Sequence, residues 1–113
     1  MDKYLFALLG ESGATGLAKG IYLIRKEDRF HIAYENELSH WEYFKRFRRS
    51  LLEKPVYYTL FLVGILVGIM GMPIIRKVVN KIESQALDFY YKNFEINGEM
   101  AKIVEDEKHH FIK

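Results

Sequence analysis

PVYYTLFLVGILVGIMGMPII, residues 55–75, is an uninterrupted run without a charged side chain in a chain of 113 residues. Lys54 precedes this run, and Arg76 and Lys77 follow it. As a helix rising about 1.5 Å per residue, the run covers roughly 31 Å, close to the hydrocarbon thickness of a bilayer. A buried helix of a soluble domain needs a large surrounding fold, which a short chain with 28% charged residues cannot supply. The run therefore predicts a transmembrane helix over residues 55–75.

Residues 1–24 form a second apolar segment with two charges in its middle. Between Tyr4 and Ile24 the charged residues are Glu11 and Lys19, which follow at i and i+8 along one helix face. Each charge costs about 2.5–3.5 kcal/mol near the centre of a bilayer, so both must face protein. We expect a second, protein-embedded span with Glu11 and Lys19 as an intramembrane charge pair. An interfacial helix or a loop is the alternative for this segment.

Small residues recur at helical spacing in both segments and predict close helix packing. Gly16-Leu-Ala-Lys-Gly20 and Gly64-Ile-Leu-Val-Gly68 are GxxxG patterns, which let two membrane helices approach closely. The simplest use is an antiparallel hairpin of the two spans, and docking onto a larger partner's helix is the alternative. The predicted helix-packing residues are Gly13, Gly16, Gly20, Gly64, Gly68 and Gly71.

The segments outside the two spans are charged and amphipathic. Residues 25–54 carry apolar residues at spacings of three or four and predict a basic amphipathic connector helix. Residues 76–113 predict a charged helical tail, with a break at Asn97-Gly98 followed by a short helix from Glu99 to Lys108. The predicted fold class is thus an all-α membrane protein, a two-span helical hairpin with an amphipathic connector and a charged tail.

Basic and aromatic residues alternate at the end of the connector. Such a pattern favours binding to the headgroups of anionic lipids such as cardiolipin. Side chains that pair with a neighbouring subunit are a compatible alternative. The predicted headgroup-binding residues are Lys45, Arg46, Arg48, Arg49 and Lys54.

The sequence predicts no catalytic, cofactor-binding or metal site. The absence of Cys excludes thiol chemistry, and a net charge of +2 is unlike that of a nucleic-acid-binding chain. His31 and His40 are expected on a solvated or interfacial face. His109 and His110, with Glu105 and Asp106, are expected to bind a metal only adventitiously. We therefore expect no enzyme, no small-molecule substrate, and no cofactor beyond bound phospholipid.

Three short motifs carry a resemblance to a known family. Gly13-Ala-Thr-Gly16, Lys54-Pro55-Val-Tyr57 and Arg76-Lys77 lie within residues 5–80. This region resembles the small two-helix accessory subunit in the membrane arm of mitochondrial respiratory complex I. The resemblance implies a noncatalytic subunit of the mitochondrial inner membrane that stabilises or assembles the proton-pumping arm. Hydrophobic subunits of that complex and membrane lipids would be its partners.

Other functions fit the same outline. The chain could be an accessory subunit of ATP synthase or cytochrome c oxidase. It could equally be a small regulatory protein of a bacterial inner membrane, or a scaffold that bends or dimerises membranes through its connector. Co-purification separates these alternatives, because an accessory subunit is lost from the membrane when its complex is absent.

Overall fold

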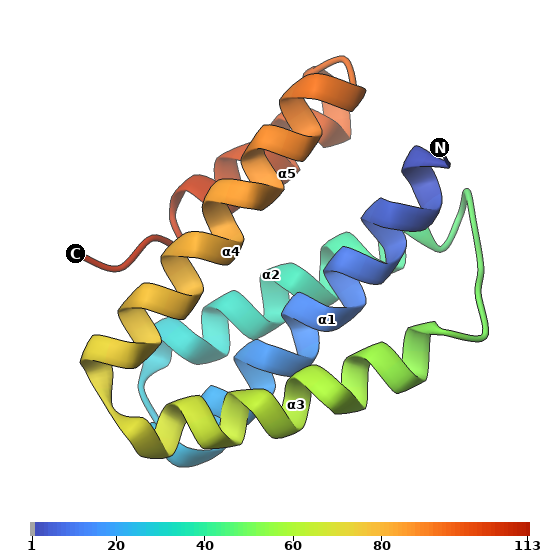
Figure 1. Cartoon of the computed structure of the whole chain (residues 1–113). Helices are drawn as coiled ribbons and strands as arrows, with labels where there is room; N and C mark the ends of the chain where they lie inside the picture. Colours follow the sequence, from blue (N-terminus) through green and yellow to red (C-terminus); the bar gives the residue numbers. More distant parts are fainter. Residues whose placement is uncertain (1) are drawn as a thin grey trace. The chain divides into compact units, whose positions relative to one another are not determined.

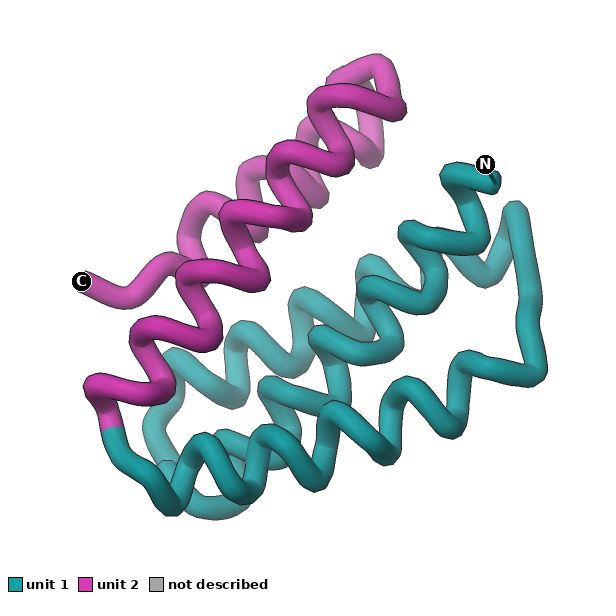
Figure 2. Tube along the Cα trace, in the orientation of Figure 1, with its two compact units in different colours: residues 1–71 teal, residues 72–113 magenta. Residues whose placement is uncertain are grey.

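The computed structural model describes residues 2–113, and over this range the chain forms five helices and no strand. This confirms the all-helical class. The chain divides into two compact units, Met1–Gly71 and Met72–Lys113 (Figure 2). The helices are α1 (Lys3–Ile24), α2 (Asp28–Phe44), α3 (Glu53–Met70), α4 (Met72–Asn93) and α5 (Gly98–Lys108) (Figure 1).

In unit 1, α1 is the central helix and packs on both α2 and α3 (Figure 1). It begins where the Asp2 carboxylate accepts a hydrogen bond from the Leu5 amide at 3.0 Å, as expected of a helix N-cap. Leu8, Leu17 and Ile21 are buried along its length. A helix covered on two sides by protein need not carry its charged residues into lipid.

The order of contacts gives the direction of each helix beside α1. Helix α2 runs antiparallel to α1, because Glu11 lies near His40 and Lys19 near Tyr34, whereas α3 runs parallel to α1. From the start to the end of α1, Gly13 lies nearest Val56, Gly20 nearest Phe61, and Ile24 nearest Gly68. A two-span hairpin requires the opposite direction for α3, so the hairpin prediction is wrong. The physical reason is that α2 is long enough to return the chain along α1 before α3 begins.

The uncharged run does not form one continuous helix. Gly71 has a φ of 101°, a left-handed conformation that side chains with a Cβ rarely adopt, and it separates α3 from α4. Within the described residues, α3 alone meets the length and composition expected of a helix that could cross a membrane. The second predicted span, on α1, is not supported.

Unit 2 is an antiparallel pair of helices whose C-terminal end is held back on α4. The side-chain amide of Asn80 donates to the Ile112 carbonyl oxygen and accepts from the Ile112 amide, both at 2.8 Å. Arg76 Nε donates to the Lys113 carbonyl oxygen at 3.0 Å. The break at Asn97-Gly98 and the following short helix lie where the sequence predicts them. These contacts fix the segment after α5 beside α4.

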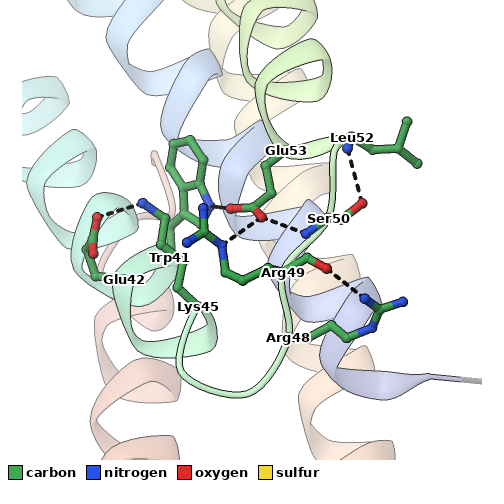
Figure 3. Close-up of polar contacts among 8 residues, drawn as sticks. All are labelled: Trp41, Glu42, Lys45, Arg48, Arg49, Ser50, Leu52 and Glu53. Carbon is green, nitrogen blue, oxygen red and sulfur yellow. Dashed lines mark hydrogen bonds and ion pairs between the residues drawn. The ribbon is translucent and has the colours of Figure 1, made fainter.

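A buried carboxylate organises the connection between α2 and α3 (Figure 3). Glu53, the first residue of α3, accepts hydrogen bonds from Trp41 Nε1 at 2.9 Å, Arg49 Nε at 3.0 Å and the Ser50 amide at 2.8 Å. Burial alone would raise the pKa of this carboxyl group, but the donors from Ser50, Trp41 and Arg49 outweigh it and hold the pKa below its usual value of 4.5. The carboxylate also lies at the N-terminus of α3, where the helix dipole favours negative charge.

We expect Glu53→Gln to destabilise the chain at neutral pH by about 2 kcal/mol, because a hydrogen bond to a buried charged group contributes about 1.5–3 kcal/mol. Since the folded-state pKa is lowered, this contribution is present above pH 4.5 and is lost as the pH falls through the folded pKa. Urea unfolding of the two proteins at pH 7 and near pH 3.5 measures the difference. A gap that stays constant between these pH values would contradict the assignment. Glu42→Gln is the matched control, because Glu42 is exposed and its partner is Lys45.

Candidate metal centre

Unit 1 contains a buried cluster of two carboxylates and one imidazole, here called set 1 and made of Glu11, Glu37 and His40. Glu11 lies on α1, and the other two lie on α2. His40 Nδ1 is 3.1 Å from Glu37 Oε1 and 3.4 Å from Glu11 Oε1. None of the three side chains is more than 3% exposed. One potential ligand atom from each residue lies within 4.8 Å of the others.

Local helix geometry explains why these three side chains meet. Glu37 and His40 are three residues apart on α2 and so project from the same face. Phe30 and Phe44 are buried on that face, one at each side of the pair, and direct it toward α1. On α1, the Glu11 side chain points toward this pair, with its Oε1 atom 3.4 Å from His40 Nδ1.

Unit 2 contains the same combination, set 2, made of Glu83, Glu107 and His110. Glu83 lies on α4, Glu107 on the last turn of α5, and His110 just after that helix. His110 Nδ1 is 3.4 Å from Glu107 Oε1 and 3.6 Å from Glu83 Oε1, and all three side chains are at most 6% exposed. Within the described residues, Glu83 Oε2 is buried without a hydrogen-bond donor. The two hydrogen bonds between Asn80 and Ile112 hold the chain beside α4 two residues after His110.

The two carboxylates of set 2 favour a positive charge between them. Burial raises the pKa of Glu83 to about 7, against the opposing effect of His110. For His110, burial lowers the pKa, but the adjacent Glu107 and Glu83 carboxylates outweigh it and raise the pKa to about 10. A protonated imidazole therefore neutralises part of the carboxylate charge. A metal cation bound by the same oxygens and a neutral imidazole would take over that role and release the proton.

The two sets have the same order and a similar spacing along the chain. In each, a single Glu on one helix precedes a Glu-x-x-His sequence, and the interval from Glu11 to Glu37 is close to that from Glu83 to Glu107. Carboxylate oxygen and imidazole nitrogen are good ligands for iron, manganese and zinc. A buried ion pair requires only one partner of each sign, so two acids around one histidine, repeated, favour a ligand set over a structural pair.

The structure separates the predicted charge pair on α1. Glu11 faces His40, and Lys19 lies over the ring of Tyr34, with Nζ 4.9 Å from its centroid. Lys19 makes no ion pair with Glu11 among the described residues. The reason is that positions i and i+8 on a helix are about 12 Å apart along its axis.

The structure also corrects the prediction for His40, which was expected on a solvated or interfacial face but is 1% exposed. His31 is partly exposed, 3.7 Å from Glu35. His110 lies beside Glu83 and Glu107 and not beside the predicted Glu105 and Asp106, whereas His109 is exposed.

Most of the predicted packing glycines lie between α1 and α3. A Cβ at Gly16 would meet the Tyr57 carbonyl oxygen, one at Gly20 the Phe61 carbonyl oxygen, and one at Gly64 the Leu17 carbonyl oxygen. The contacts are looser at the ends of this interface. A Cβ at Gly68 would lie 2.9 Å from Ile24 Cβ, and one at Gly13 would lie 3.2 Å from Val56 Cγ1. Gly71 does not extend the ridge and instead ends α3.

The predicted headgroup-binding residues lie around the connection from α2 to α3, several of them in contact with acids (Figure 3). Lys45 pairs with Glu42 at 2.8 Å, Arg48 with Asp2 at 2.8 Å, and Arg49 with Glu53 at 3.0 Å. Arg46 lies over the ring of Tyr43, with its guanidinium carbon 5.6 Å from the ring centroid, and Lys54 is exposed. All five therefore lie at one end of unit 1, and only part of their charge is neutralised locally.

The sequence analysis missed Glu37, Glu83 and Glu107, and it assigned no metal role to His40 and only an adventitious one to His110. The available signal was the repeated Glu-x-x-His spacing, each copy preceded by a Glu at a similar interval. No protein-family model, curated protein or solved structure shows a significant match to this chain.

Proposed function

We propose that the chain is a metalloprotein that binds two redox-active transition-metal ions, iron or manganese, in a dinuclear centre. The observation that carries the proposal is the repetition of one buried ligand set in chain order. The proposed ligands are Glu11, Glu37, His40, Glu83, Glu107 and His110.

This ligand pattern has a known use in helical proteins. In ferritin-like di-iron and di-manganese carboxylate proteins, two helices each contribute one Glu and two others each contribute a Glu-x-x-His. Here α1 and α4 carry the single acids, α2 carries one Glu-x-x-His, and the second such sequence begins at the end of α5. The analogy concerns the ligand set alone and rests on no homology.

Ligand chemistry and the cost of burial support the same proposal. The carboxylate oxygens and the imidazole nitrogen of each set are ligands that iron and manganese accept, and water would fill the remaining positions of the four to six that these ions usually have. Without a metal, taking four carboxylates out of water costs several kcal/mol each. A bound cation offsets this cost, and its affinity becomes part of the folding free energy.

The proposed activity is oxidation chemistry that uses molecular oxygen at the reduced centre. Carboxylate-rich sites with one imidazole per ion suit iron and manganese, whose redox states lie within reach of oxygen. This proposal differs from the noncatalytic accessory role in a respiratory complex, which stays a prediction. Native electrophoresis with mass spectrometry tests that role separately, by the subunits that co-migrate with the chain.

Metal stoichiometry tests the proposal directly. We expect the purified, chelator-treated chain to bind two Fe(II) or two Mn(II) ions under anaerobic conditions, measured by equilibrium dialysis and elemental analysis. The Mn(II) form should give an exchange-coupled electron paramagnetic resonance spectrum, and the Fe(II) form should consume oxygen when exposed to air. Binding of less than one ion per chain at micromolar free metal would overturn the metalloprotein proposal. Two ions without spin coupling would overturn its dinuclear part.

A further inference from the structure

We propose that unit 1 lies flat on an anionic lipid bilayer, with one face of α3 inserted into the membrane surface and no segment crossing it. This face, here called the outer face of α3, exposes large apolar side chains in a helical stripe. Its five most exposed members have relative exposures between 59% and 63% and are Tyr58, Leu62, Leu66, Ile69 and Met70. Single exposed apolar residues are ordinary, whereas a stripe along a whole helix marks a binding surface.

The opposite face of α3 is already occupied, which fixes how the helix can meet a membrane. Gly64 and Gly68 pack against α1, and Val67 is buried. The α1 backbone is so close that α3 cannot leave it without breaking this interface. The outer face can therefore contact lipid along the whole length of α3, whereas the face that packs on α1 cannot.

A transmembrane position of α3 would carry the rest of unit 1 into the hydrocarbon. Helix α1 runs parallel to α3, and α2 packs on α1. Exposed charged residues, among them Asp28, Arg29 and Glu35, are distributed along α2. Charged side chains are strongly disfavoured in the bilayer core, whereas they are well solvated when α2 faces water. An in-plane position satisfies both helices.

Charge complementarity identifies the occupant as an anionic lipid surface. Helix α3 has no charge after Lys54, and the preceding connection exposes Leu51 and Leu52 close in sequence to Arg46 and Arg49. Apolar tips flanked by basic groups are typical of segments that enter the headgroup region. Tyrosines follow at the start of α3, and amphipathic rings favour that depth. A purely protein partner would not explain this order of basic, aromatic and apolar residues.

Flotation of the full chain with vesicles tests the proposal. We expect binding to phosphatidylcholine vesicles that contain cardiolipin, with a partition coefficient at least tenfold higher than for phosphatidylcholine alone. The double change Leu62→Glu/Leu66→Glu should lower the partition coefficient by about 100-fold, because it removes two inserted side chains. Arg46→Glu/Lys54→Glu should lower it mainly at low salt, with removal of each positive charge accounting for about fivefold. Ile32→Glu, which changes an equally exposed residue on α2, is the matched control.

Insertion depth separates an in-plane helix from a spanning one. The chain has no Cys, so single cysteines at positions 58, 62, 66 and 69 accept a fluorophore selectively. We expect all four to be quenched best by a quencher near the headgroups, at similar depth. Fluorophores at positions 62 and 66 that lie much deeper in the bilayer than those at positions 58 and 69 would indicate a helix that crosses the membrane and would overturn the in-plane proposal. So would equal vesicle binding by the Leu62→Glu/Leu66→Glu variant, or the absence of vesicle binding by the parent chain. Retention of metal binding by this variant keeps the result independent of the metal proposal.

Discussion

Replacing Gly20 by alanine is expected to destabilise unit 1 by about 3 kcal/mol or more, a large part of the roughly 5–15 kcal/mol typical of a folded domain. The added Cβ would meet the Phe61 carbonyl oxygen and would lie 2.8 Å from the Ile65 amide nitrogen and 2.9 Å from Gly64 Cα. All three are backbone atoms. A flexible side chain could rotate away, but a backbone can only separate from its neighbour, so the whole α1–α3 interface would open.

Gly10→Ala is the matched control, because it makes the same change on the same helix. Nothing lies within 4 Å of a Cβ at Gly10. Since Gly is less favourable than Ala in a helix by about 0.5–1 kcal/mol, Gly10→Ala should stabilise the chain slightly. Urea unfolding followed by circular dichroism measures both variants. Equal effects of the two substitutions would show that α1 and α3 do not pack as described.

Metal binding by the Gly20→Ala variant shows whether the substitution disturbs only the α1–α3 packing or also the metal-binding residues. Gly20 lies away from set 1, since its close contacts are all on α3. At a temperature where the Gly20→Ala variant remains folded, it should still bind metal. Its stability deficit should also persist in the metal-bound state, because metal binding adds the same linkage term to both proteins.

The sequence predicted the elements of this fold better than their arrangement. The uncharged run predicted a helix, and the GxxxG spacing identified Gly16, Gly20 and Gly64 as residues that need close approach. Neither the uncharged run nor the GxxxG spacing indicates whether two helices pack parallel or antiparallel. Two apolar segments predict an antiparallel hairpin because two membrane spans joined by a loop must be antiparallel. The intervening helix α2 instead permits the parallel pairing.

The candidate metal centre was missed for a related reason. The sequence marks Glu11 as a costly charge that must face protein, and helical spacing predicts Lys19 on the same helix as its partner. The observed neighbour is His40, which is distant in sequence and is brought close by the antiparallel α1–α2 pair. Apolar periodicity does not distinguish a buried histidine from an exposed one on an amphipathic helix, so the sequence predicts a solvated His40. Only the second copy of the spacing, ending at His110, distinguishes a repeated ligand set from two ordinary surface acids.

His110→Ala is expected to lower the affinity for metal by at least 100-fold, since loss even of an outer-shell partner typically costs about 10–100-fold. If set 1 and set 2 hold one dinuclear centre, as proposed, this change in set 2 should weaken the binding of both ions and abolish their spin coupling. His109→Ala is the control, because His109 is adjacent in sequence but exposed. It should retain two coupled ions per chain.

Loss of His110 also leaves Glu83 and Glu107 as buried acids without their positive neighbour, which alone can destabilise the metal-free protein. Glu107→Gln avoids this difficulty, because it keeps the shape and removes one negative charge. We expect it to raise the thermal stability of the metal-free chain and to lower metal affinity, two effects of opposite sign. A purely structural role for set 2 predicts that stability changes while metal binding does not. If His110→Ala instead retains one tightly bound, uncoupled ion, the two sets act as independent sites, and the dinuclear proposal is wrong even though each set binds metal.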